Sequence, residues 1–381
     1  MSAIKKIQKG LAWLLYRALP VQKNKVVFTS FYGRGASDNP KAIVDELAKC
    51  PEKLDIVWLA KDPDHAGVPE GVRVVPYDTP AAIREMSTAK VWVDNCRKGA
   101  RNKKKGQYYM QTWHGFALKR IERDVADKLN TPENAAYAEY AKRDSAQIDA
   151  IISNSTFMTK IYQESFWYDG PVLEYGSPRN DILVHPSADA KKTIAKALHL
   201  PEDCRYIMYA PTFRADHSLD AYQLDYHRTC HACEQRFGGK WIMLVRLHPG
   251  IMQLAKDLTF DNEVTFDATA FDDMQLLLSA CDAVITDYSS LMFDFALTRR
   301  PCFQFATDID AYKTDRNFYF PIDETPFPPA KTNAEMVQHI LDFDDAEYQK
   351  DWDAFYEKMG FCEDGQATQR CVQWILDKIK T

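Results

Sequence analysis

Short runs of β-branched and aromatic residues alternate with longer stretches of helical periodicity along the 381-residue chain. This alternation is typical of α/β proteins, in which mostly parallel strands are buried between helices. The pattern predicts two sets of strands. The first set covers residues 26–31, 55–60, 72–76, 91–95, 108–113, 150–154 and 172–175, and the second covers residues 206–210, 241–247, 264–267, 283–287 and 302–305.

Turn-forming residues separate the two sets of strands. Gly176-Ser-Pro-Arg-Asn-Asp181 and the polar stretch 185–192 predict a hinge near residues 180–195. The chain length also suits two domains of about 150 to 200 residues each. We therefore expect two Rossmann-like domains with mostly parallel sheets that face a cleft. Their predicted bounds are 23–188 and 189–350, followed by C-terminal helices at 351–381 that can cross back to the first domain.

The first 22 residues have the pattern of an amphipathic helix. Apolar residues recur at helical spacing over residues 4–18, with Lys5, Lys6 and Lys9 on the other side. The apolar run is shorter than the about 20 residues that a membrane-spanning helix needs. Two interpretations remain, a helix packed on its own domain and a helix that lies on a membrane surface.

A basic run favours the membrane interpretation. Residues 97–105 read Arg-Lys-Gly-Ala-Arg-Asn-Lys-Lys-Lys, with six cations in nine residues. Near acidic lipid headgroups each cation contributes about 1 kcal/mol, although a solvated loop is the usual explanation of such a run. We therefore expect a peripheral protein on an anionic membrane surface.

The overall composition excludes other classes. A net charge of −6 argues against a nucleic-acid partner, which requires a strongly basic face. Nine cysteines without a disulfide framework are typical of reduced thiols in a cytoplasmic protein. The predicted location is the cytoplasmic face of the cell membrane.

Ligands of parallel α/β sheets bind beyond the carboxyl ends of the strands. In the second domain these positions carry hydroxyl groups, an arginine and a histidine, which suit phosphate oxygens. In the first domain they carry polar residues beside a histidine and a glycine. Plain helix capping and structural hydrogen bonding are the alternatives for each position taken alone. The second-domain candidates are Thr212, Arg214, His248, Pro249, Thr286, Asp287, Ser289 and Ser290, and the first-domain candidates are Asn95, Arg97, His114 and Gly115.

Metal and cofactor motifs are weak in this sequence. It has neither a Walker loop nor a complete GxGxxG fingerprint. Asp62-Pro-Asp64 and Asp308-Ile-Asp310 have the spacing of metal-binding carboxylates, and we interpret both as surface loops. His227, Cys230 and His231 would share a helix face as zinc ligands could, whereas an ordinary helix is the favoured interpretation. We expect no required metal or other cofactor.

Six motifs occur in order along the chain. They are Thr112-Trp-His-Gly115, Gly176-Ser-Pro-Arg-Asn-Asp181, Tyr209-Ala-Pro-Thr-Phe-Arg214, Arg246-Leu-His-Pro249, Ile285-Thr-Asp-Tyr-Ser-Ser290 with Phe293-Asp-Phe-Ala296, and Asp364-Gly-Gln-Ala-Thr-Gln-Arg370. These motifs resemble those of the CDP-glycerol glycerophosphotransferases, peripheral membrane enzymes of teichoic acid synthesis, and the resemblance covers nearly the whole chain. Two departures occur, because the family commonly has Thr-Pro where this chain has Phe116-Ala117, and Trp where it has Phe213.

The resemblance implies a GT-B fold and a reaction. Glycerol phosphate would move from CDP-glycerol, the donor substrate, to an acceptor hydroxyl, with release of CMP. His114 would be the general base, and Arg214, His248, Ser289 and Ser290 would neutralise the phosphates, with Arg370 as a further donor-binding cation. Thr286 and Asp287 would lie near the nucleotide, and Asn95, Arg97 and Gly115 on the acceptor side.

The resemblance also suggests the acceptor. Family members near this length resemble primases, which add the first glycerol phosphate to a lipid-linked disaccharide. A poly(glycerol phosphate) or poly(ribitol phosphate) polymerase of teichoic acid or capsule is the near alternative. A nucleotide-sugar glycosyltransferase of GT-B fold is the alternative from a different class.

Overall fold

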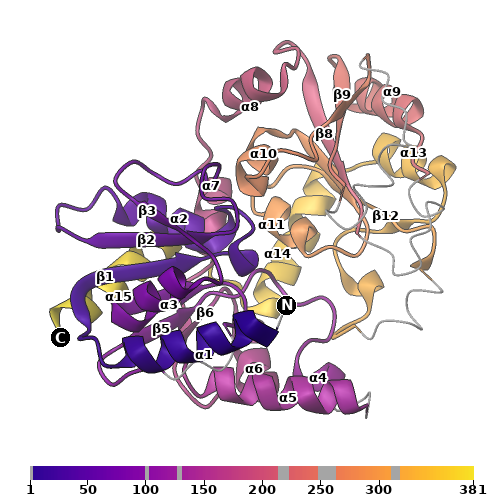
Figure 1. The fold of residues 1–381 in the computed structure, drawn as a ribbon. Coiled ribbons are helices and arrows are strands. Elements are labelled where there is room, and N and C mark those ends of the chain that lie inside the picture. Colours follow the sequence, from indigo (N-terminus) through magenta and orange to yellow (C-terminus); the bar gives the residue numbers. More distant parts are fainter. Residues whose placement is uncertain (1–2, 99–102, 127–130, 213–222, 248–262, 310–317) are drawn as a thin grey trace. The chain divides into compact units, whose positions relative to one another are not determined.

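A computed structural model of the protein describes residues 3–98, 103–126, 131–212, 223–247, 263–309 and 318–381. The chain divides into two compact units, whose elements are labelled in Figure 1. The first unit contains Met1–His114, Ile121–Asp181 and Phe361–Thr381. The second unit contains Gly115–Arg120 and Ile182–Gly360.

The first unit is built on a seven-stranded sheet with the order β3-β2-β1-β4-β5-β6-β7, and every neighbouring pair in it is parallel. Its strands are Gln22–Thr29 (β1), Asp55–Ala60 (β2), Arg73–Pro76 (β3), Ala89–Asp94 (β4), Tyr108–Gln111 (β5), Ala150–Ser153 (β6) and Val172–Glu174 (β7). Its helices are Ala3–Arg17 (α1), Asp38–Leu47 (α2), Pro80–Thr88 (α3), Arg123–Ala126 (α4), Pro132–Ser145 (α5), Thr156–Ser165 (α6) and Ala367–Lys380 (α15), and the short helix Asp181–Val184 (α7) begins where this unit ends.

The second unit has a six-stranded sheet with the order β10-β9-β8-β11-β12-β13, again parallel throughout. Its strands are Arg205–Ala210 (β8), Trp241–Val245 (β9), Thr265–Asp267 (β10), Ala283–Thr286 (β11), Cys302–Phe305 (β12) and Pro329–Ala330 (β13). Its helices are Ala190–Leu198 (α8), Tyr226–Phe237 (α9), Met274–Ala280 (α10), Leu291–Ala296 (α11), Asn333–Leu341 (α13) and Asp345–Met359 (α14).

The predicted α/β class with parallel sheets is confirmed. All predicted strands are present, and β2 and β12 have the predicted ends. Among the described residues, the two-residue strand β13 is the one strand that was not predicted, because Pro329 and Ala330 carry no strand pattern. Several helices begin after a capping residue, since Thr79, Ser155 and Asp273 each accept a hydrogen bond from a backbone N–H of the first turn.

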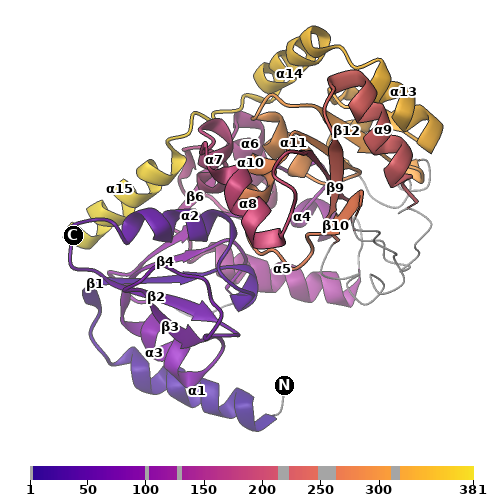
Figure 2. The ribbon, with the colours of Figure 1, turned by 90° about the horizontal axis from the view of Figure 1, so that it is seen from above.

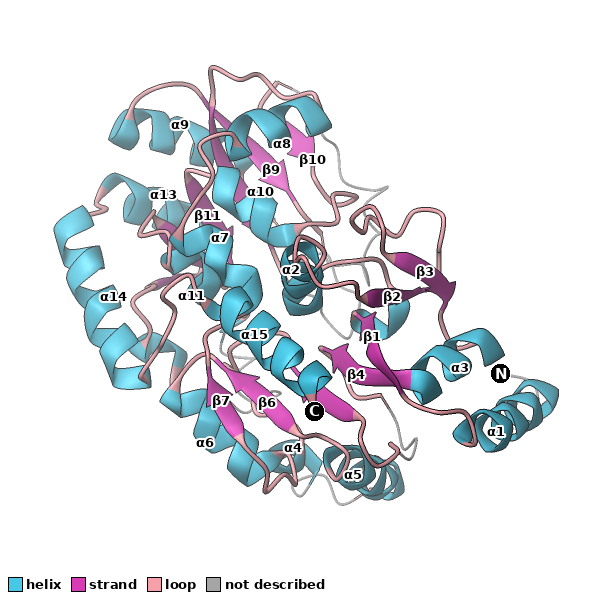
Figure 3. Cartoon of the chain, turned by 90° about the vertical axis from the view of Figure 1, so that its left-hand side faces the viewer, coloured by secondary structure: helices cyan, strands magenta, loops and turns pink. Residues whose placement is uncertain are grey.

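Helix α15 completes the core of the first unit although it follows the whole second unit in sequence. Its buried face consists of Cys371, Val372, Ile375 and Leu376, which pack with Val26 and other side chains of β1, β2 and α2. Figure 2 shows α15 beside α2, and the two helices are in contact. In the second unit α9 packs against α13, and Figure 3 shows both helices. The apolar core of this unit includes side chains of β8 and β9.

Helix α1 packs along α3, as Figures 1 and 3 both show. Lys9 is 6% exposed and pairs with Asp78. Three leucines nevertheless face solvent, with exposed fractions of 58% for Leu11, 74% for Leu14 and 63% for Leu15. Within the described residues, none of the helices has the length and the apolar character needed to span a membrane.

Candidate functional site

His114 follows β5 at the carboxyl edge of the first sheet, and both its backbone and its ring are held in place. Its ring stacks on Trp113, with 4.4 Å between ring centroids and 21° between planes. Phe31, which follows β1, lies on it at 5.5 Å. The His114 backbone oxygen accepts a hydrogen bond of 2.8 Å from Nη1 of Arg179. The imidazole is thus half-buried in a fixed aromatic setting.

A network of buried polar residues orients the histidine loop. Arg179, 7% exposed, also pairs with Asp38 at 2.5 Å. The amide of Asn39 accepts a hydrogen bond from the Arg179 backbone N–H at 3.1 Å and donates to the backbone oxygens of Thr112 and Trp113. An Arg–carboxylate pair with additional hydrogen bonds has a well-defined geometry. Arg179, Asp38 and Asn39 therefore position His114, a role that the sequence analysis missed.

The motif 176–181 also joins the histidine loop to the C-terminal motif. Glu363 accepts hydrogen bonds from the Ser177 backbone N–H at 2.9 Å and from Asn180 Nδ2 at 3.1 Å. Asp181 accepts from the backbone N–H groups that open α15, at Ala367 and Thr368. From the sequence we predicted this segment as a turn and as one of the family motifs without a role for its side chains, whereas in the structure it is a hub that connects three segments.

Gly176 is required at the start of this hub. Its φ of +87° lies in the left-handed region. A Cβ atom placed there would come within 2.9 Å of Glu363 Oε2 and 3.2 Å of the Ala367 Cβ. A side chain would therefore push the C-terminal segment away.

The pKa of His114 is lowered from its ordinary value of 6.5, chiefly because burial disfavours the charged imidazolium. The Asp38 carboxylate acts in the opposite direction and raises this pKa, while the Arg179 guanidinium lowers it. A neutral imidazole at cellular pH can accept a proton, which is the property that a general base requires.

The backbone near His114 is strained. Phe31, Tyr32 and Asp38 have φ values of +41°, +58° and +64°. Such conformations cost about 1 kcal/mol or more per residue and persist where the surroundings enforce them. Here Asn95, fully buried, contributes to that enforcement, because its Oδ1 accepts from the Phe31 backbone N–H at 2.9 Å.

The two other predicted acceptor-side residues lie in different settings. Arg97 is 3% exposed, and its guanidinium bonds Glu122 at 2.6 Å, Asp144 at 3.3 Å and Ser145 at 2.9 Å. These bonds hold the guanidinium against buried carboxylates inside the first unit, and the expected acceptor contact of Arg97 stays a prediction. Gly115 is half-buried and is the first residue of the second unit.

Thr212, Thr286 and Asp287 come together where β8 and β11 end. Asp287 is 1% exposed, and its carboxylate accepts from the backbone N–H of Thr212 at 2.9 Å and of Tyr288 at 2.6 Å. Thr286 Oγ1 donates to the Ala210 backbone oxygen at 2.6 Å. Thr286 and Asp287 therefore stabilise the ends of β8 and β11, and their predicted contact with the nucleotide stays a prediction.

The remaining donor-side candidates divide into three cases. Ser289 and Ser290 are half-buried, and Ser289 Oγ accepts from the Leu291 backbone N–H at 3.3 Å, whereas Ser290 makes no capping bond. Arg214, His248 and Pro249 lie outside the described residues. Arg370 belongs to the first unit, where it pairs with Asp364 and donates to the Tyr175 backbone oxygen at 3.0 Å.

The segment Gly115–Arg120 leaves the histidine and joins the second unit. Phe116 is 3% exposed and packs against Phe293 of α11 with 4.8 Å between ring centroids, and against Phe320 at 6.3 Å. The packing of the Phe116 ring therefore explains an aromatic residue at the position where the family commonly has Thr. Phe116 anchors this segment in an aromatic cluster of the second unit.

Most described cations of the basic run 97–105 are paired within the protein, so fewer of them are available to a membrane surface than the composition suggested. Arg97 and Lys98 pair with buried carboxylates, and Lys103 pairs with Asp149. Lys104 Nζ donates to the Leu19 backbone oxygen just beyond α1 at 2.6 Å, and Lys105 is exposed. Among the described residues of the run, Lys104 and Lys105 are the cations without a carboxylate partner, and residues 99–102 lie outside the described residues.

The zinc alternative is not supported. Cys230 and Cys233 are buried in the core of the second unit, whereas the side chain of His231 is 68% exposed. In the part of the chain that the structure describes, no three His, Cys, Asp or Glu side chains are grouped to hold a metal ion. Asp62 lies on the surface beside His65, as expected. Asp308 differs from its surface interpretation, because it is half-buried and accepts a hydrogen bond from the Tyr288 hydroxyl at 2.9 Å.

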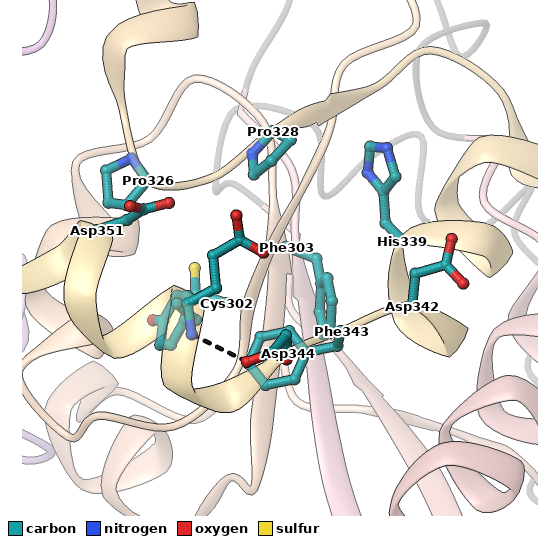
Figure 4. A pocket seen from close by; sticks show the side chains of 11 residues that line it. Cys302, Phe303, Pro326, Pro328, His339, Asp342, Phe343, Asp344 and Asp351 are labelled. Carbon is teal, nitrogen blue, oxygen red and sulfur yellow. Dashed lines mark hydrogen bonds between the residues drawn. The ribbon is translucent and has the colours of Figure 1, made fainter.

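A cavity of about 260 Å³ opens between β12, α13 and α14 (Figure 4), and none of the predicted site residues that the structure describes is among its lining residues. Phe303 and Phe343 form part of its wall, and Asp342, Asp344 and Asp351 carry carboxylates around it. A ring of negative charge repels phosphate groups, so this cavity is not a candidate for a nucleotide.

Comparisons with known proteins give the family. The family model described as CDP-Glycerol:Poly(glycerophosphate) glycerophosphotransferase matches residues 11–377. A teichoic acid poly(glycerol phosphate) polymerase of Staphylococcus epidermidis is 34% identical over 94% of this chain, which spans 51% of that relative. The chain thus covers about half the length of this polymerase. A teichoic acid glycerol-phosphate transferase of Staphylococcus aureus is 31% identical over 98% of this chain and 99% of its own length.

Solved structures agree with this assignment. The wall teichoic acid polymerase TagF, as an H444N variant soaked with CDPG, superposes with a TM-score of 0.87 and 31% identity, over 99% of this chain and 94% of that one. A putative UDP-N-acetylglucosamine 2-epimerase of Listeria monocytogenes, at 13% identity and a TM-score of 0.53, shares the fold alone. The fold is therefore of GT-B type, as the motifs implied. With six ordered motifs, two parallel sheets and a family model matched over nearly all its length, the chain belongs to the CDP-glycerol:poly(glycerophosphate) glycerophosphotransferase family.

Proposed function

We propose that the protein transfers glycerol phosphate from CDP-glycerol to a hydroxyl group of a membrane lipid-linked disaccharide and releases CMP. The observation that carries the proposal is the fixed, half-buried imidazole of His114 at the carboxyl edge of the first sheet. Family membership supports CDP-glycerol as the donor.

The proposed reaction requires one general base for the acceptor hydroxyl and cationic groups around the phosphates of the donor. The acceptor oxygen attacks the phosphorus of the glycerol phosphate group, and the bond from that phosphorus to the CMP oxygen breaks. CMP leaves with the bonding electron pair, and His114 takes the proton of the acceptor hydroxyl. Because CMP departs as a stable anion, charge neutralisation matters more than protonation. We assign this neutralisation to Arg214 and His248, without a required metal ion.

The number of units transferred separates two forms of the proposal. Primase-type addition of one unit is our first proposal. Repeated addition by a polymerase is the second, because the S. epidermidis polymerase is 34% identical to this chain. Purified protein, CDP-glycerol and a synthetic lipid disaccharide are incubated, and product masses are measured. One added unit indicates a primase and a ladder indicates a polymerase.

The same assay tests the donor and the metal. CDP-ribitol replaces CDP-glycerol in one arm, UDP-sugars in another, and a chelator is added in a third. We expect turnover with CDP-glycerol and no loss of activity with the chelator. Turnover with UDP-sugars alone would instead favour a nucleotide-sugar glycosyltransferase.

The pH dependence of transfer tests the base. Burial and the Arg179 guanidinium lower the pKa of His114, whereas the Asp38 carboxylate raises it, so Asp38→Asn removes a charge that raises this pKa. The acidic limb of the kcat/KM profile is therefore expected to move to lower pH, because His114 stays neutral further into acid. Asp45→Asn on the same helix is the matched control, since Asp45 pairs with Lys41. A limb unchanged by Asp38→Asn would contradict the assignment.

We also propose that α1 places the protein on an anionic membrane surface. Leu11, Leu14 and Leu15 form an exposed apolar patch, and Lys104 binds the chain just beyond the helix. Leu11→Glu with Leu14→Glu is expected to reduce binding to vesicles containing anionic lipid by at least about tenfold, because apolar burial is lost and like charges are introduced. Sedimentation with vesicles measures this. A Val125→Glu variant, which changes another exposed apolar residue, is the control, and equal binding of the α1 variant and the wild type would exclude the anchor.

A further inference from the structure

Arg120 ends the segment that crosses into the second unit, six residues after His114 in sequence. The neighbouring residues fix it there. Lys119 pairs with Phe318 in an antiparallel bridge, and the Leu118 backbone oxygen accepts from the Tyr319 N–H at 3.0 Å. The Arg120 guanidinium lies over the Tyr319 ring, with Cζ 5.3 Å from the ring centroid.

Arg120 has no acidic partner among the residues that the structure describes. Its Nε is buried without a hydrogen-bond partner there. Arg97, Arg179 and Arg299 are different, since each is paired with an acidic side chain. The half-buried Arg120 is therefore a cation whose charge is balanced by no carboxylate and whose Nε–H has no acceptor within the described part of the chain.

Leaving a buried hydrogen-bond donor without an acceptor costs about 1 to 3 kcal/mol. A ligand that binds beside Arg120 and accepts this hydrogen bond would remove that cost. A guanidinium group can donate two parallel hydrogen bonds to phosphate oxygens. Its contact with an aromatic ring fixes the orientation of the guanidinium plane before a phosphate binds. We infer that Arg120 binds a phosphate group of a substrate, an assignment that rests on the proposed function.

Two substrates bring phosphate to this protein, the diphosphate of CDP-glycerol and the phosphate of the lipid-linked acceptor. The segment Gly115–Arg120 packs with the unit that contains Thr212 and Asp287, which favours the donor. The chemistry recognised is the same in both cases, and binding measurements distinguish them.

The experiment compares Arg120→Ala, Arg120→Lys and a matched Arg205→Ala control. Arg205 also stacks on an aromatic ring, Trp241 at 5.7 Å, but is exposed at the amino end of β8. The dissociation constant of CDP-glycerol is measured by calorimetry without acceptor, and the KM of the acceptor is measured at saturating CDP-glycerol. Arg120→Ala is expected to raise the dissociation constant by about 10- to 100-fold, with Arg120→Lys intermediate and Arg205→Ala unchanged.

The two arms assign the source of the phosphate. A rise confined to the dissociation constant of CDP-glycerol indicates that Arg120 binds a phosphate of the donor. A rise confined to the KM of the acceptor indicates that Arg120 binds the acceptor phosphate. No change in either value for a folded Arg120→Ala variant, with the melting temperature of the wild type, would overturn the inference. A wild-type protein that binds no CDP-glycerol and releases no CMP would instead refute the proposed function, so the two failures are distinct.

Discussion

Replacing His114 by alanine is expected to lower kcat for glycerol phosphate transfer by about 10²- to 10⁴-fold, the usual contribution of a positioned general base. The dissociation constant of CDP-glycerol is expected to stay near the wild-type value, because the base acts on the acceptor hydroxyl. CMP release is followed with purified protein and lipid acceptor.

A control separates loss of the base from general damage. His65→Ala changes an exposed histidine that pairs with the exposed Asp62 and should leave kcat unchanged. Since the His114 ring also packs on Trp113 and Phe31, a His114→Gln variant retains much of the volume while losing the base. Full turnover by either His114 variant would refute the assignment.

Replacing Arg97 by methionine is expected to destabilise the first unit by about 3 to 5 kcal/mol. This is the usual cost of removing one partner of a buried ion pair, and here Glu122 and Asp144 are left buried, with exposed side-chain fractions of 3% and 0%. Urea unfolding followed by tryptophan fluorescence measures the loss.

The matched control is Arg299→Met, because Arg299 and Asp353 form an exposed pair with side chains 54% and 57% accessible. That pair is expected to contribute about 1 kcal/mol or less. A stable Arg97→Met protein with a raised acceptor KM would instead support the acceptor contact expected from the sequence.

The sheets were predictable from the sequence because buried parallel strands leave continuous apolar runs. Residues 55–60 and 302–305 were located to the residue. Strand ends elsewhere shifted because polar residues such as Gln22 and Lys23 extend a strand beyond its apolar run. The partners of charged side chains were harder to predict from the sequence. Arg97 and Lys98 have the appearance of a solvated basic run, and only the tertiary structure reveals the carboxylates that pair with them.

The site was predictable in part for a similar reason. His114 stands out because it follows a strand and precedes a glycine. Asp38 and Asn39 also follow a strand, but nothing in their local pattern connects them with Arg179, some 140 residues away. Phe116 was unexplained because its partners Phe293 and Phe320 lie more than 170 residues away in the sequence, and no local pattern connects them.

The hub at residues 176–181 has a consequence for how the protein is made. Asp181 and Asn180 bind the segment 363–368, and α15 fills the core of the first unit. A ribosome releases α15 only after the entire second unit, so the nascent first unit lacks part of its core and one support of the His114 loop until late in translation. The second unit can thus fold ahead of the first, and a chain cut short before Glu363 would carry its histidine on a loosened loop.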